Sequence, residues 1–207
     1  MTSDSQIQKV LSRYGFSAGT ALCESIRSYT ALLVRWNKKI SLTTVTDPER
    51  ILAFHFGESL FAVEKVPIKF GRLADVGSGG GFPGIPLAMA SPELEVTLVE
   101  SNAKKSAFLS EVVRTLKLAR VTVVRSRMED LPPNSNGFEF VTARAVGHHE
   151  DLLSWSRKAL IRDGKLVLWI GAPDATKISG DPTWLWRHPI PIPGSRDRVL
   201  LIGTPKV

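Results

Sequence analysis

A glycine-rich stretch contains the first residues whose types and spacing indicate a chemistry. The sequence RLADVGSGGGFPGIPLAMA runs from Arg72 to Ala90, and five glycines fall between Gly77 and Gly84. Glycine adopts positive φ angles without strain and lets the backbone approach a ligand closely. The residues after the loop have a helical pattern, and the first turn of a helix offers free N–H groups. The stretch therefore predicts a loop that binds a nucleotide-like ligand.

Two acids near this loop narrow the choice of ligand. The GxGxxG series that begins at Gly79 formally matches the dinucleotide fingerprint, which alone is a weak signal. Glu100 lies 23 residues after Gly77 and suits the ribose hydroxyls of either NAD or S-adenosylmethionine. Asp75 favours S-adenosylmethionine, because the ammonium and sulfonium groups of that ligand attract a carboxylate, whereas a pyrophosphate is an anion. An NAD-linked oxidoreductase remains the weaker alternative, and Asp75 could instead brace the loop through hydrogen bonds.

Two further acids, Glu129 and Asp130, lie in the sequence SRMEDLP, after the apolar run Val121–Arg125. If that run is a strand of the same sheet, these acids lie where an adenine amino group could be read. A solvated turn is the alternative interpretation.

The residues at the end of the apolar run that begins at Phe138 restrict which kind of atom could accept a methyl group. Thr142-Ala-Arg-Ala stands there, where enzymes that methylate exocyclic amines usually carry [DN]-P-P-[YF]. Methylation of a pyrimidine carbon needs a cysteine nucleophile, and Cys23, the one cysteine of the chain, lies on or beside an apolar stripe, as a core residue would. An acceptor that is already nucleophilic remains, and such an acceptor needs mainly orientation.

The histidines do not have the spacing of metal ligands. His148 and His149 are adjacent, and His55 and His188 are distant in sequence. We expect loop or capping roles for them and no metal site.

Apolar runs alternate with helical patterns from residue 72 onward. The predicted strands are Leu73–Val76, Val96–Glu100, Val121–Arg125, Phe138–Thr142, Lys165–Ile170 and Val199–Gly203. The predicted helices are Gly84–Ala90, Lys104–Leu118 and Glu150–Leu160. This alternation predicts an α/β, Rossmann-like fold, with a mostly parallel sheet and helices on both faces. Residues 172–195 are rich in Pro and Gly and predict mainly loop, with WLWRHPI as a candidate short strand.

The first 70 residues predict a helical extension. Apolar side chains recur at helical spacing from Leu22 to Ile40. Asp47 and Pro48 are typical of a helix start, and that helix would stop before Pro67. We therefore divide the chain into an N-terminal helical extension, residues 1–70, and a ligand-binding domain, residues 71–207.

The charge of the chain is unevenly distributed. The net charge is +7; residues 1–71 carry nine basic and six acidic residues, residues 72–150 nine of each, and residues 151–207 nine and five. Basic flanks fit a polyanion such as RNA, although a basic protein without such a partner has the same composition. The candidate RNA contacts are Lys38 and Lys39, beside Trp36, and Arg196 and Arg198 in the tail.

The chain has no apolar run long enough for a membrane span, and its start lacks the pattern of a signal peptide. With a single cysteine there is no disulfide framework. We expect a cytoplasmic protein without membrane contact, and a monomer.

Several motifs together resemble those of the bacterial RsmG (GidB) family of class I methyltransferases. They are DVGSGGGFPGIPLA, LVES, SRMEDL, FEFVTARAVG and LIRDGKLVLWIG, in this order. The FPGIP extension of the loop is the most specific motif, and RWNKKISLTTVTDPERILAFHFGESL resembles the family's N-terminal signature. The resemblance covers residues 35–171 well and is loose over residues 1–34 and 172–195. Glu58 stands where the family more often has Asp, and SNAKK replaces a more usual Gly-Lys-Arg run.

Members of this family methylate N7 of a guanosine in 16S ribosomal RNA, so the resemblance implies that reaction. It also implies S-adenosyl-L-methionine as the cofactor and 16S rRNA, or the small ribosomal subunit, as the partner. The positions that match the family's cofactor contacts are Gly77, Phe82, Met128, Glu129 and Arg144. Arg144 could pair with the methionine carboxylate or donate to the guanine edge, and is the catalytic candidate. We do not expect it to be a buried structural residue, because arginine is almost never fully buried unless it is paired. Guanine N7 has an in-plane lone pair and no proton to lose, which fits the lack of an evident base.

Two further alternatives remain from the sequence. The same fold serves methyltransferases that act on small molecules or proteins. A non-enzymatic RNA-binding protein on this scaffold is less favoured, because a pure binder does not need the glycine loop and its acids.

Overall fold

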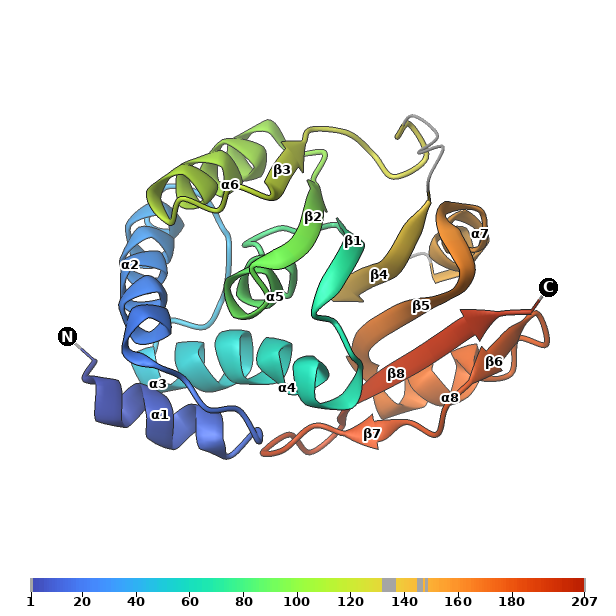
Figure 1. Cartoon of the computed structure of the whole chain (residues 1–207), viewed down its shortest axis with the longest axis horizontal. Helices are drawn as coiled ribbons and strands as arrows, with labels where there is room; N and C mark the ends of the chain where they lie inside the picture. Colours follow the sequence, from blue (N-terminus) through green and yellow to red (C-terminus); the bar gives the residue numbers. More distant parts are fainter. Residues whose placement is uncertain (1, 132–136, 145–146, 148, 207) are drawn as a thin grey trace.

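A single sheet forms the centre of the molecule. The computed structural model describes residues 2–131, 137–144, 147 and 149–206, and Figure 1 shows the order of its elements. Within these residues the strands lie in the order β3-β2-β1-β4-β5-β8-β6, and β7 also pairs with β8. The strands are β1 Phe70–Val76, β2 Glu93–Val99, β3 Val121–Val124, β4 Phe138–Arg144, β5 Leu160–Gly171, β6 Trp184–Trp186, β7 Ile190–Pro191 and β8 Arg198–Pro205. The pairs among β1 to β5 are parallel and those of β8 are antiparallel, so the predicted mostly parallel sheet is confirmed.

Helices cover both faces of this sheet, as predicted. The alternation of β1 shows the two faces, because Leu73 packs into one apolar cluster while Ala74 and Val76 pack into another. Leu73's cluster contains side chains of α5 (Gly84–Ala90) and α6 (Ala103–Thr115). The second cluster contains side chains of α7 (His149–Ala159) and α8 (Ala172–Ile178). Strands buried on both faces read as continuous apolar runs, which made them recognisable.

The N-terminal helices pack on the α5 and α6 side. They are α1 Asp4–Ser12, α2 Thr20–Asn37, α3 Pro48–Ile51, the π-helix η1 Leu52–Gly57 and α4 Glu58–Lys65. Their buried side chains share one apolar cluster with those of the sheet, and Cys23 lies fully buried in it, as predicted. The start at Asp47 is confirmed, because its Oδ1 accepts a hydrogen bond from the Arg50 amide at 2.8 Å. The division at residues 70 and 71 stays a prediction.

Two local predictions differ from the structure. Only about half of residues 172–195 are loop, because α8 begins directly after Gly171 with Pro173 in its first turn and Ala175 and Ile178 buried. Proline is compatible with a first helical turn, so its presence there did not exclude a helix. The short strand predicted in WLWRHPI is present as β6. The predicted strand at Lys165–Ile170 also starts earlier, at Leu160.

None of the helices among the described residues is both long enough and apolar enough to span a lipid bilayer.

Candidate cofactor site and the arginine cluster

The glycine loop joins the end of β1 to the start of α5. Because β1 lies between β2 and β4, the loop sits where the chain order of the parallel strands diverges, the usual ligand position of such sheets. Gly77, Gly79 and Gly81 have φ angles of +69°, +53° and +86°. The amides of Gly77 and Ser78 donate to the Val99 carbonyl at 2.9 and 3.0 Å, which anchors the loop to β2. The prediction that this stretch needs positive φ is confirmed.

The glycines of the loop have different surroundings. A Cβ on Gly79 would meet no atom closer than the Gly77 oxygen, at 3.7 Å. A Cβ on Gly81 would overlap the Tyr29 hydroxyl, and one on Gly84 would lie 2.8 Å from Asp75 Oδ2. Gly81 and Gly84 therefore face the protein interior, and Gly79 faces open space that a ligand could occupy.

Asp75 braces the glycine loop against the sheet. Its side chain is fully buried, Oδ2 accepts from the Gly84 amide at 3.2 Å, and Oδ1 accepts from Thr142 Oγ1 at 2.8 Å. Burial raises the pKa of Asp75 to about 6, and the hydrogen bonds from Thr142 and Gly84 oppose this shift. The structure thus gives Asp75 the bracing role that was the alternative in the sequence, and its direct contact with a cofactor stays a prediction.

Glu100 approaches the loop from the end of β2. Its Oε2 accepts from the Gly79 amide at 2.9 Å and its Oε1 from the Asn102 amide at 2.8 Å. Glu100 is buried, with 7% of its surface exposed. The structure brings Glu100 and Gly79 together, as the spacing predicted, and contact with a ribose stays a prediction.

The residues after β3 divide between core and surface. Met128 is buried in the same apolar cluster as Val76, whereas Glu129 and Asp130 are exposed. The Leu131 amide donates to the Met128 carbonyl at 3.2 Å, which closes a turn. The contact of Glu129 and Asp130 with adenine stays a prediction.

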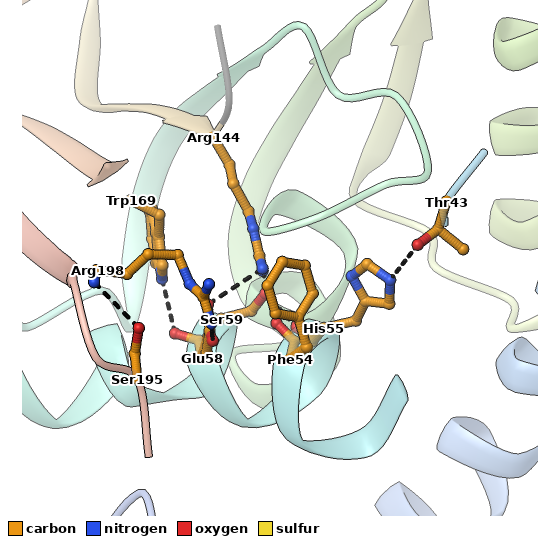
Figure 2. Close-up of polar contacts among 9 residues, drawn as sticks. All are labelled: Thr43, Phe54, His55, Glu58, Ser59, Arg144, Trp169, Ser195 and Arg198. Atoms are coloured by element: carbon orange, nitrogen blue, oxygen red, sulfur yellow. Dashed lines mark hydrogen bonds and ion pairs between the residues drawn. The ribbon is translucent and has the colours of Figure 1, made fainter. Parts of the chain in front are cut away.

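Arg144 belongs to a buried cluster of charges, shown in Figure 2. From the end of β4 its Nη1 donates to the Phe54 carbonyl at 2.8 Å and its Nη2 to Glu58 Oε2 at 3.1 Å. Arg198 reaches the same carboxylate from β8, with Nε 3.1 Å from Glu58 Oε2. Both guanidinium groups lie over the Phe54 ring, 4.2 and 4.4 Å from its centroid.

The burial of this cluster corrects one expectation. Arginine was not expected as a buried structural residue at the end of β4, yet the Arg144 side chain is 9% exposed and Glu58 is 2% exposed. Burial lowers the pKa of Arg144 to about 10, and the Glu58 carboxylate opposes the shift, so the guanidinium stays charged at neutral pH. In the sequence, Glu58 stands out only as a departure from a family pattern and Phe54 does not stand out, because no local pattern indicates ion pairs with residues 86 and 140 positions away. The cofactor or guanine contact of Arg144 stays a prediction.

His55 differs from its expected loop or capping role. It lies in η1, is 6% exposed, and its Nε2 is 2.8 Å from Thr43 Oγ1. Burial lowers the pKa of His55 to about 3, and the charge of Arg144 contributes in the same direction, so the ring is neutral. Its ring stacks on Phe82, which joins the arginine cluster to the glycine loop.

The proposed RNA contacts have unequal surroundings. Lys38 and Lys39 are exposed at the end of α2, whereas Trp36 packs edge-on against Phe108 and donates to Glu111 Oε2 at 2.7 Å. In the tail, Arg196 is exposed and Arg198 is held by Glu58. Contact of these residues with RNA stays a prediction.

No group of three or more His, Cys, Asp or Glu that could hold a metal occurs in the part of the chain that the structure describes. His188 is exposed, and His148 lies outside the described residues.

Comparison with protein families gives one match over most of the chain. The family model described as "rRNA small subunit methyltransferase G" matches residues 22–184. The chain is 45% identical over 130 residues to "Ribosomal RNA small subunit methyltransferase G" of Stutzerimonas stutzeri, covering 63% of this chain and 60% of that relative. It is 40% identical over 180 residues to the protein of the same name from Xylella fastidiosa, covering 84% of each. The chain thus aligns with less than two thirds of the first relative's length.

Solved structures agree in fold. A SAM-dependent methyltransferase from Aquifex aeolicus superposes with a TM-score of 0.65 at 15% identity, covering 77% of this chain and 94% of that one. Magnesium protoporphyrin IX methyltransferase from Synechocystis, solved with bound SAM, gives 0.60 at 14% identity, covering 86% and 97%. The chain therefore has the class I methyltransferase fold.

Proposed function

The chain belongs to the rRNA small subunit methyltransferase G family, and we propose that it methylates N7 of a guanosine in 16S rRNA with S-adenosylmethionine. The observation that carries the proposal is the glycine loop inside a family match over residues 22–184. In that loop Gly79 faces open space, while its neighbours Gly81 and Gly84 are packed against the core.

The residues present fit a cofactor of this kind. A bare backbone at Gly79, held from one side by Glu100, offers the close approach that a nucleoside needs. Gly77, Phe82, Met128 and Glu129 are the other positions that match the family's cofactor contacts; Gly77 and Glu129 are exposed, whereas Phe82 and Met128 are buried. S-adenosylmethionine supplies an electrophilic methyl group on a sulfonium.

Asp75 serves this site by holding its shape. Both of its oxygens accept hydrogen bonds, one from the loop and one from β4, so it ties the Gly84 amide to Thr142. A fixed loop binds ligand without first losing conformational entropy.

Arg144 remains the candidate for contact with the methionine carboxylate or the guanine edge. Its hydrogen bonds to Phe54 and Glu58 use two N–H groups, and a guanidinium carries five N–H donors. Donors therefore remain for a ligand while Glu58 fixes the plane of the group. Arg144 would therefore bind the ligand with a guanidinium group that Glu58 already holds in place.

The acceptor is proposed from chemistry. Guanine N7 has a free lone pair, so transfer needs alignment with the methyl group and no base to remove a proton. Lys38, Lys39 and Arg196 are exposed cations that would hold RNA phosphates, with Arg198 a weaker candidate because Glu58 pairs with it.

The test is single-turnover methyl transfer from labelled cofactor to small ribosomal subunits, and to naked 16S rRNA, that lack the modification. Mapping the labelled position should show one guanosine methylated at N7. Label on an exocyclic amine or a ribose would overturn the N7 assignment. Label that appears only on protein or on a small molecule would overturn the RNA substrate.

A further inference from the structure

Tyr29 reaches the glycine loop from a distant part of the chain. It lies on α2, is fully buried, and its Oη donates to the Gly80 carbonyl at 2.5 Å. The next loop residue, Gly81, has no side chain, and this makes room for the Tyr29 hydroxyl, because a Cβ on Gly81 would overlap that hydroxyl. The loop and the tyrosine are therefore fitted to each other.

The ring of Tyr29 also forms one side of an aromatic stack. Phe82 lies between Tyr29, with ring centroids 5.1 Å apart and planes 11° apart, and His55, at 4.4 Å and 16°. Phe56 meets both Tyr29 and Phe82 edge-on, at 5.4 Å each. Stacked and edge-to-face contacts are favourable geometries for aromatic rings. Phe82 is thereby held on both faces and on one edge by residues of the N-terminal helices.

The protonation states suit a permanent contact. Burial raises the pKa of Tyr29 well above its ordinary value, and the nearby Asp75 adds to the shift, so the phenol remains a donor. The low pKa of His55 keeps the opposite ring neutral.

We propose that Tyr29 is a positioning residue for the cofactor, which fixes the Gly80 carbonyl through its hydroxyl and the Phe82 ring through its own ring. The backbone between these points, beside Gly79, then has its ligand-binding shape before the ligand arrives. This inference rests on the proposed function, because it takes the glycine loop to be the cofactor site. It also gives α2 a part in cofactor binding, beyond its packing against α5 and α6.

The experiment compares two variants that each lose one hydroxyl from α2. Tyr29→Phe removes the hydrogen bond to Gly80 and keeps the ring stack. Thr30→Val is the matched control, because Thr30 Oγ1 is buried without a hydrogen-bond partner among the described residues. Binding of S-adenosylhomocysteine is measured by calorimetry well below the melting temperature of each variant. The KM for the cofactor, kcat and RNA affinity are measured alongside.

We expect Tyr29→Phe to weaken S-adenosylhomocysteine binding about fivefold, the ratio that corresponds to one lost hydrogen bond. The cofactor KM should rise in proportion, while kcat and RNA affinity stay unchanged. Tyr29→Leu, which also removes the stacked ring, should lose more. Thr30→Val should bind like the wild type.

Two kinds of outcome would overturn the inference. Wild-type affinity in a folded Tyr29→Phe chain would show that the hydroxyl has no role in binding. A loss that merely follows the fraction of unfolded chain, or an equal loss in Thr30→Val, would show a structural role only. Failure of the wild-type chain itself to bind S-adenosylhomocysteine would instead overturn the proposed function.

Discussion

Asp75 and Glu58 are two buried carboxylates near one end of the sheet, and their partners differ in charge. Asp75 is fully buried and accepts hydrogen bonds from neutral groups, the Gly84 amide and the Thr142 hydroxyl. Glu58 is 2% exposed and is paired with two guanidinium groups, those of Arg144 and Arg198.

The difference shows two ways to place a carboxylate in a protein interior. Neutral donors compensate part of the desolvation of Asp75, and its pKa remains raised to about 6. Opposite charges compensate the burial of the Glu58 carboxylate, and removing that charge would leave two guanidinium groups beside Phe54 without the carboxylate that they share. Replacing each carboxylate by its amide should therefore have different effects on stability.

The largest effect is expected at the arginine cluster. Glu58→Gln leaves Arg144 buried without an opposite charge, and should lower the free energy of unfolding by about 3 kcal/mol in urea titrations. Glu49→Gln is the control, since its pair with Arg13 spans 3.5 Å between side chains that are 68% and 55% exposed. That variant should change stability by less than about 0.5 kcal/mol. Equal losses of stability in the two variants would show that the buried ion pairs of Glu58 stabilise the fold no more than an exposed pair does.

Arg144→Lys tests the cluster through activity. Lysine keeps the charge and loses the planar fork, so it cannot hold Phe54, Glu58 and a ligand together. We expect turnover to fall about tenfold or more, with a loss of stability of about 1–2 kcal/mol because the side chain is buried. Arg198→Lys, at a side chain that is 37% exposed, should lose less of both. Wild-type turnover in Arg144→Lys would exclude a direct role.

Asp75→Asn should change the pH dependence of stability. The pKa of Asp75 is about 6 when folded and 3.8 ordinarily, so the folded chain binds the proton more tightly. This contribution to stability is present below about pH 4 and is lost as the pH rises through about 6, by about 2–3 kcal/mol. The difference in unfolding free energy between wild type and Asp75→Asn should therefore shift in favour of the variant across that range. A difference that is constant from about pH 4 to 7 would contradict the raised pKa.

How well the sequence predicts the glycine loop and its surroundings depends on how far apart in the chain the contacting residues lie. The brace by Asp75 on Gly84 spans nine positions within one strand–loop–helix unit, so the pattern of acid and glycines was visible. The same locality explains why β1, its loop and α5 were predicted with few errors. Spacing along the chain also placed Glu100 near Gly79.

The arginine cluster and the aromatic stack follow from tertiary packing. Glu58 pairs with residues 86 and 140 positions away, and Tyr29 contacts a carbonyl 51 positions away. Helical spacing predicted only that Tyr29 faces the core. The identity of the surface that it meets depends on how α2 and η1 pack against the loop, which no local pattern records. The helix α8 was missed for a different, local reason, because the Pro and Gly residues of segment 172–195 were interpreted as loop, although Pro173 is compatible with a first helical turn.

The smallest effect is expected for the exposed lysines that we propose as RNA contacts. Replacing Lys38 and Lys39 by Gln should weaken RNA binding several-fold at low salt and reduce the slope of log affinity against log salt by about 1–2. Cofactor affinity should not change. Lys69 and Lys158, exposed near the amino ends of β1 and β5, are the matched control pair. An equal effect from the control pair would mean that net charge alone matters.

The most direct test of the account is the binding of S-adenosylhomocysteine to Gly79→Val, with Gly15→Val as the matched control. Both glycines have positive φ, +53° and +77°, and in both a Cβ would meet no atom closer than 3.6 Å. The two substitutions should therefore cost similar stability, about 1–2 kcal/mol, and both chains should fold. Gly79→Val should abolish binding, whereas Gly15→Val should bind like the wild type. Unchanged affinity in a folded Gly79→Val chain would contradict the assignment of the glycine loop as the cofactor site.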